Sequence, residues 1–197
     1  MTDHLLLFLA ASLVLLVTPG PAVLYIVTRS VSQGPMAGII SALGVGVGGL
    51  VHVAGAALGL SAILASSATA FSVVKYLGAA YLVWLGLQAL RSGGAAAAPQ
   101  AEAPRPLGRI FREGIVGNIL NPKTAIFFLA FLPQFVTPGA GSVTGQVVLL
   151  GLVFIVLAVV TDSLYALLAG RLAGWLRAHP RFPVVQRRVS GPVYVGL

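Results

Sequence analysis

The first apolar stretch of the chain, residues 5–28, contains a break that a continuous membrane helix cannot accommodate. Proline lacks the N–H group and clashes with the carbonyl four residues before it. Within a bilayer, backbone groups freed in this way are tolerated only where protein or a water-filled cavity satisfies them. We therefore expect part of a functional site at this break. Its residues are Thr18, Pro19, Gly20 and Pro21.

The composition predicts an all-α polytopic membrane protein. Of the 197 residues, 58% are hydrophobic and only 8% are charged, whereas about a quarter of the residues of soluble domains are charged. Several apolar runs approach or exceed the roughly 20 residues that cross a bilayer. The alternation of apolar and polar residues typical of membrane β-barrels is missing from the sequence. We predict one transmembrane domain over residues 1–197.

Six apolar segments predict six helices, with the last one incomplete because it is too short to span. They cover residues 5–28, 37–64, 71–90, 113–133, 144–169 and 189–197. The first and fourth are broken by proline. Glycines are frequent in the second, which is typical of closely packed membrane helices. Residues 91–111 are rich in Ala, Pro and Gly and predict a flexible cytoplasmic linker between two halves.

The net charge of +8 indicates membrane orientation and not nucleic-acid binding. The loops after the first, third and fifth segments hold ten arginines, whereas the other side holds only Lys75. Basic loops remain in the cytoplasm, so the sequence predicts a periplasmic or extracellular N-terminus. The start of the chain has no basic region before its apolar run, and we read it as a retained helix and not as a signal peptide.

The two halves show a weak internal repeat. A shift of 103 residues places Pro19 on Pro122 and Ala22 on Ala125. Because each half would contain three helices, the halves would face opposite ways across the membrane. Inverted repeats with interrupted helices at matching positions indicate a binding site near the middle of the bilayer. We therefore predict two inverted three-helix repeats.

Polar residues cluster at the break in the fourth segment. Asn118, Asn121 and Lys123 surround Pro122. Lysine within a membrane is costly and normally faces a bundle interior or a transport pathway. The alternative is that the helix begins later and that Lys123 extends to the cytoplasmic interface.

Asp162 is the one acid that lies inside an apolar segment. It is a candidate partner for Lys123, a proton or a substrate amine, and a structural ion pair is the alternative. His52 on the second segment is a candidate proton carrier or, as a lone histidine among small residues, part of the packing. We expect no metal site and no cofactor, and common catalytic patterns are missing.

In these motifs the chain resembles the LysE/RhtB family of bacterial amino-acid exporters. The matching motifs are Thr18–Pro21, Gly78–Gly86 (GAAYLVWLG), the Asn118 to Lys123 stretch and Asp162. The resemblance implies a multi-pass protein of the bacterial inner membrane that exports amino acids or their derivatives and is driven by protons. It also implies a transporter and not an enzyme. A homo-oligomer remains open as the assembly state.

We expect alternating access between the two halves, with the residues at the two breaks binding substrate and Asp162 facing its amino group. Two other classes stay open at this point. One is a transporter or channel for other small solutes or ions. The other is a membrane enzyme or scaffold, which the missing catalytic pattern and the two broken helices argue against.

Overall fold

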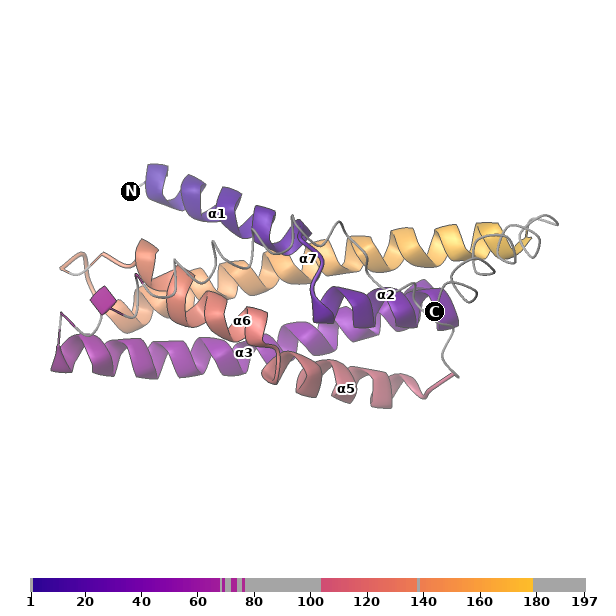
Figure 1. Ribbon diagram of the computed structural model, residues 1–197, viewed down its shortest axis with the longest axis horizontal. Helices are drawn as coiled ribbons and strands as arrows, with labels where there is room; N and C mark the ends of the chain where they lie inside the picture. The colour runs from indigo at the N-terminus through magenta and orange to yellow at the C-terminus, as the bar shows by residue number, and fades with distance from the viewer. Residues whose placement is uncertain are drawn as a thin grey trace, which may run out of the picture.

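The computed structural model describes residues 2–67, 69, 72, 73, 76, 104–137 and 139–178. All regular secondary structure in these ranges is helical, which confirms the predicted all-α class for this part of the chain (Figure 1). Most of the predicted helix over 71–90, the motif at Gly78–Gly86, most of the linker over 91–111 and the predicted helix over 189–197 lie outside the described residues.

The elements follow one another with short connections wherever the chain is described. They are α1 (Thr2–Val17), α2 (Pro21–Gln33), α3 (Pro35–Ser66), α5 (Leu107–Ile119), α6 (Pro122–Ile126), the π-helix η1 (Phe127–Phe131), the 3-10 helix η2 (Leu132–Phe135) and α7 (Val143–Ala178). Helices α3 and α7 are each long and apolar enough to cross a membrane. Up to four spans result if each of the two bent helix pairs counts as one.

Both bent pairs change direction at a proline. The axes of α1 and α2 differ by 55°, and those of α5 and the Pro122–Phe135 segment by 47°. Pro21 and Pro122 each occupy the start of the second helix, where the missing N–H would have had no helical partner anyway. These two helix starts are 101 residues apart, which is two residues fewer than the shift of 103 that pairs Pro19 with Pro122.

Two helices extend beyond their predicted bounds. Helix α5 begins at Leu107, within the predicted linker, where apolar content alone predicted a start at 113. Glu113 in this helix forms ion pairs with Arg109 of the first turn and with Arg105, which precedes the helix, and such polar contacts support a helix where hydropathy gives no signal. Helix α7 continues to Ala178, beyond the predicted end at 169.

Helix α3 packs along α5 through glycines that bring the two backbones together. A Cβ atom on Gly44 would lie 2.2 Å from the carbonyl oxygen of Phe111, and one on Gly48 would lie 2.5 Å from that of Ile115. A Cβ atom on Gly46 would lie 2.5 Å from a side-chain methyl group of Val159 of α7. This stretch of glycines therefore serves close packing, whereas Gly55 has no such neighbour within 4 Å.

The helices run in two opposed directions. In Figure 1, α1, α2 and α7 run from left to right, and α3 and the α5–α6 pair run from right to left. The start of α1, the end of α3 and the start of α7 share one end of the molecule. The end of α2 and the starts of α3 and α5 share the other, together with the end of α7. The two broken helices thus cross the molecule in opposite senses.

Aromatic side chains fill the interior between α1, η1, η2 and α7. The rings of Phe127 and Phe154 stack with centroids 3.8 Å apart, and Phe8 lies edge-on to Phe135 at 5.2 Å. Phe8 and Phe127 are fully buried. This phenylalanine cluster, which also contains Phe128 and Phe131, joins the first helix to the segment after the second break.

Candidate functional site

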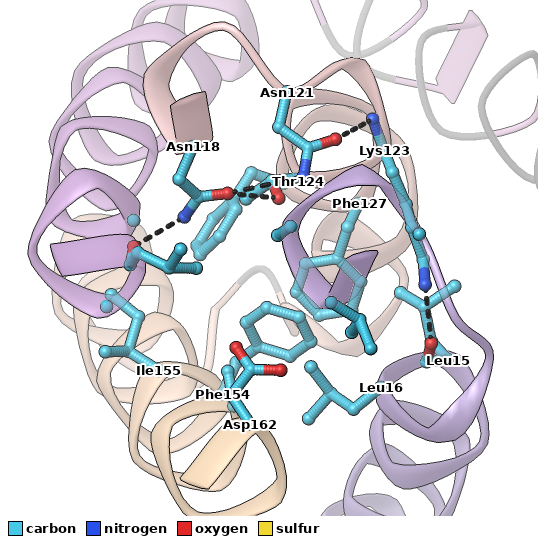
Figure 2. Close-up of a pocket in the computed structure, with 18 residues that line it drawn as sticks. Leu15, Leu16, Asn118, Asn121, Lys123, Thr124, Phe127, Phe154, Ile155 and Asp162 are labelled. Atoms are coloured by element: carbon cyan, nitrogen blue, oxygen red, sulfur yellow. Dashed lines mark hydrogen bonds between the residues drawn. The ribbon is translucent and has the colours of Figure 1, made fainter. Parts of the chain in front are cut away.

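The two helix breaks meet at a cavity of about 60 Å³ (Figure 2). Its walls come from α1 and α2, from the glycines of α3, from the α5–α6 break and η1, and from α7. Five predicted site residues line it. They are Gly20, Asn118, Asn121, Lys123 and Asp162. The remaining lining is largely apolar and includes Leu16, Val23, Phe127, Phe154, Ile155 and Ala158.

Asp162 supplies a negative charge to the cavity wall. Its side chain is 5% exposed, and Figure 2 shows the carboxylate directed between the aromatic and aliphatic walls. Among the described residues it accepts no hydrogen bond, and it forms no ion pair with Lys123, although the two charges attract each other through the cavity. A buried carboxylate without such a partner is costly unless a cation or a proton joins it. The arrangement suits a positively charged amine.

Asn118 and Asn121 hold the second break in shape. Asn118 donates from Nδ2 to the carbonyl of Val45 at 2.7 Å, and its Oδ1 accepts from the hydroxyl of Thr124 at 2.8 Å. Asn121 caps the restarted helix, because its Oδ1 accepts from the backbone N–H of Lys123 at 3.0 Å. Both side chains thus line the cavity while already bound to protein groups.

Lys123 crosses from the second break to the first. Its Nζ donates to the carbonyl oxygens of Leu15 at 2.8 Å and Thr18 at 2.5 Å, at the C-terminal end of α1. A cation is favourable there, because the helix dipole is negative at that end. A Cβ on Gly20 would lie 3.0 Å from Cδ of Lys123, so glycine leaves room for the lysine stem. Lys123 is thus directed toward the end of α1 at the first break.

His52 lies outside the cavity lining and contacts the second break from α3. Its Nε2 is 2.9 Å from the carbonyl oxygen of Asn118, and its ring stacks on Phe128 with centroids 6.0 Å apart. The histidine thus takes part in packing and in one hydrogen bond to the backbone.

The other predicted residues shape the breaks and do not face the cavity. The hydroxyl of Thr18 donates a hydrogen bond to the carbonyl of Val14 at 2.9 Å. The chain changes direction at Pro19, Pro21 and Pro122. Sequence reasoning missed Tyr165, whose hydroxyl donates to the carbonyl of Val17 at 2.7 Å. The missed signal was its position three residues after Asp162, which places both on neighbouring faces of one helix.

The first turn of α2 gives the cavity a second polar group. Gly20 precedes this helix without any side-chain cap, and Ala22 and Val23 line the cavity. The N–H groups of a first turn have no partner within their own helix. They carry the positive end of the helix dipole and suit an anion such as a carboxylate. The cavity therefore presents an acid and a helix N-terminus, which are the complements of an amine and a carboxylate.

Comparison with known proteins identifies the class. A family model described as LysE type translocator matches residues 13–195. The chain belongs to this family, which confirms the resemblance seen in the motifs, and it is a transporter and not an enzyme.

Named relatives are similar over much of their length. The chain is 34% identical to a homoserine/homoserine lactone efflux protein of Salmonella typhimurium strain LT2, over 86% of this chain and 82% of the relative. It is 32% identical to a leucine efflux protein of Salmonella choleraesuis, over 66% of this chain and 61% of that protein. It is 27% identical to an uncharacterized membrane protein of Vibrio cholerae, over 97% of this chain and 92% of the relative. No solved structure matches the chain.

Proposed function

We propose that this protein exports amino acids with uncharged side chains, or their close derivatives, across the bacterial inner membrane. The observation that carries the proposal is the cavity between the two breaks, which is largely apolar and is lined both by the buried Asp162 and by Ala22 and Val23 of the first turn of α2. The efflux relatives support the same substrate class, because one is named for homoserine and its lactone and another for leucine.

In this proposal Asp162 binds the α-amino group and the N–H groups of Ala22 and Val23 bind the α-carboxylate. The side chain of the substrate then lies against Phe127, Phe154 and their aliphatic neighbours, so apolar and small polar side chains are accommodated. Asn118 and Asn121 form the wall of the pathway and keep the second break in place.

The charges of the whole chain argue against a cationic substrate side chain. The sequence contains four acids, of which Asp3 is near the N-terminus, Glu102 precedes α5 in the sequence and Glu113 lies in the middle of α5. Asp162 is therefore the one acid within an apolar span, and it is needed for the α-amino group. A second positive charge, as in lysine, would enter the cavity without a counter-charge, which is costly in a medium of low dielectric constant.

Transport requires the two halves to move apart. A cavity of about 60 Å³ takes about four water molecules, which is less than leucine needs. We propose alternating access between two inverted three-helix halves, supported by the opposite directions of the two broken helices (Figure 1). A proton on Asp162 would replace the amine on the return step, which gives proton coupling a chemical basis.

The proposed orientation places the N-terminus in the periplasm. The ends of α2 and α7 and the starts of α3 and α5 lie together in Figure 1, and these segments carry all six of the described arginines. They are Arg29, Arg105, Arg109, Arg112, Arg171 and Arg177. Basic residues favour the cytoplasmic side, so this end would face the cytoplasm.

Cells preloaded with dipeptides test the substrate class. Dipeptides of leucine, homoserine and lysine are hydrolysed inside the cell, and the released amino acid is measured in the medium with and without expression of this protein. We expect faster release of leucine or homoserine and no change for lysine. Faster release of lysine alone would contradict the assignment, and unchanged release of all three would remove the proposed export function.

A further inference from the structure

We propose that Lys123, Tyr165 and His52 are positioning residues that replace the hydrogen bonds lost at the two proline breaks. Each donates to a backbone carbonyl that the local helix leaves without its usual partner. The transport part of this inference rests on the proposed export function, whereas the hydrogen-bonding part stands on the contacts alone.

At the first break, Pro19 is the residue whose N–H would bond the carbonyl of Leu15 in a continuous helix. Proline has no N–H, and Nζ of Lys123 occupies that place at 2.8 Å from the oxygen. The same Nζ also reaches the carbonyl of Thr18, whose helical partner is lost where the chain bends. The lysine therefore caps the end of α1 from another part of the chain.

Tyr165 completes the cap of α1. Its hydroxyl donates to the carbonyl of Val17 at 2.7 Å, at the last residue of the helix. This carbonyl is also one of the four that a helix end leaves without an intrahelical partner. Three carbonyls at the first break thus receive donors from the second half of the chain, and two side chains supply them.

At the second break, Pro122 is the residue whose N–H would bond the carbonyl of Asn118. The N–H of Asn121 reaches that oxygen at 3.0 Å in a tighter turn, and Nε2 of His52, at 2.9 Å, takes the place of the missing donor. Because a carbonyl only accepts, Nε2 must carry the proton in this contact. The parallel ring of Phe128, 15° from the plane of His52, holds the imidazole in the required orientation.

The two caps are reciprocal between the halves. The first break is capped by Lys123 and Tyr165 of the second half, and the second break is capped by His52 of the first half. Each cap holds only while the halves keep their present register. The caps therefore fix the backbone that lines the cavity in this arrangement, and movement of the halves must exchange them for other donors.

Double-mutant cycles on purified protein in detergent test the replacement of the lost hydrogen bonds, with the melting temperature as the readout. His52→Phe keeps a ring on Phe128 and removes the donor, and we expect a loss of about 5 °C. The same change in a Pro122→Ala background should cost less than half as much, because the introduced alanine supplies a backbone N–H to the carbonyl of Asn118. Lys123→Met should likewise lower the melting temperature less than half as much in a Pro19→Ala background as in the wild type.

The control pairs His52→Phe with Pro19→Ala, which share no carbonyl, so these two losses should add. Equal losses for His52→Phe in both the wild-type and Pro122→Ala backgrounds would overturn the capping of Asn118. Additive losses for Lys123→Met with Pro19→Ala would overturn the capping of Leu15. If the lysine variant does not fold, Tyr165→Phe, which removes only one hydroxyl group, replaces it as the test of the cap at the first break.

Transport measurements distinguish a positioning role of these residues in transport from a contribution to stability alone. Release of leucine from preloaded proteoliposomes is measured over a range of internal concentrations. We expect His52→Phe to raise KM at least threefold and His52→Gln, which retains an N–H donor, to restore it. A lower melting temperature with unchanged KM would overturn the positioning role. Failure of the wild type to release leucine or homoserine would instead refute the proposed export function, and the melting cycles would still decide the capping.

Discussion

Replacing Gly44 by alanine tests the contact between α3 and α5 that supports the cavity. The added Cβ would lie 2.2 Å from the carbonyl oxygen of Phe111, whereas real Cβ contacts almost never fall below 3.0 Å. The obstacle is backbone and cannot rotate away, so the two helices must separate by most of an ångström. Overpacking of this kind costs about 1–3 kcal/mol, and the better helix propensity of alanine offsets about 1 kcal/mol of it.

We expect Gly44→Ala to lower the melting temperature by about 2–4 °C, from a net loss of about 1 kcal/mol. Gly55→Ala is the matched control on the same helix, because a Cβ there meets nothing within 4 Å. It should leave the melting temperature unchanged or raise it by a few degrees. The assay follows folded protein by size exclusion after heating in detergent. Equal melting temperatures for the two variants would refute the close approach of α3 and α5.

Three further changes probe the cavity and the two ends of the molecule. Ala158→Leu should reduce leucine export more than alanine export, because Ala158 lines the cavity one turn before Asp162; equal losses for both amino acids in proteoliposomes would contradict this placement. Phe154→Leu should cost about 1 kcal/mol by removing the stack on Phe127, and an unchanged melting temperature would show that the stack contributes nothing. Glu113→Gln should cost at most about 1 kcal/mol, because its ion pairs with Arg105 and Arg109 are partly exposed; a larger loss in melting temperature would show stronger coupling.

Local chemistry made the breaks predictable from the sequence. Pro19, Pro21 and Pro122 cannot continue a helix in an apolar run, whatever surrounds them. Asp162 was equally predictable as a candidate site residue, because an acid among the aliphatic residues of a membrane segment is costly and usually functional. The glycines of α3 indicated close packing because residues without side chains let helices approach each other. Only the contact with a neighbouring helix distinguishes Gly44 from Gly55.

The pairing between the halves was not predictable, because it depends on how the helices stack. Lys123 is next to Pro122 in sequence, yet its Nζ contacts α1, more than 100 residues earlier. The long lysine stem allows many targets, and the space that Gly20 leaves for this stem shows itself only in the folded chain. The hydroxyl of Tyr165 reaches Val17 for similar reasons. The start of α5 at Leu107 was missed because polar contacts, and not hydropathy, stabilise its first turns.

The most direct test of the account is export by Asp162→Asn in proteoliposomes loaded with leucine or homoserine. Asparagine keeps the size of the side chain but removes the charge that binds the amine. We predict that the variant inserts and elutes as the wild type does. Its release of both amino acids should fall to the level of loaded liposomes that contain no protein. Export at the wild-type rate from a correctly inserted Asp162→Asn protein would contradict the central claim that this carboxylate binds the substrate.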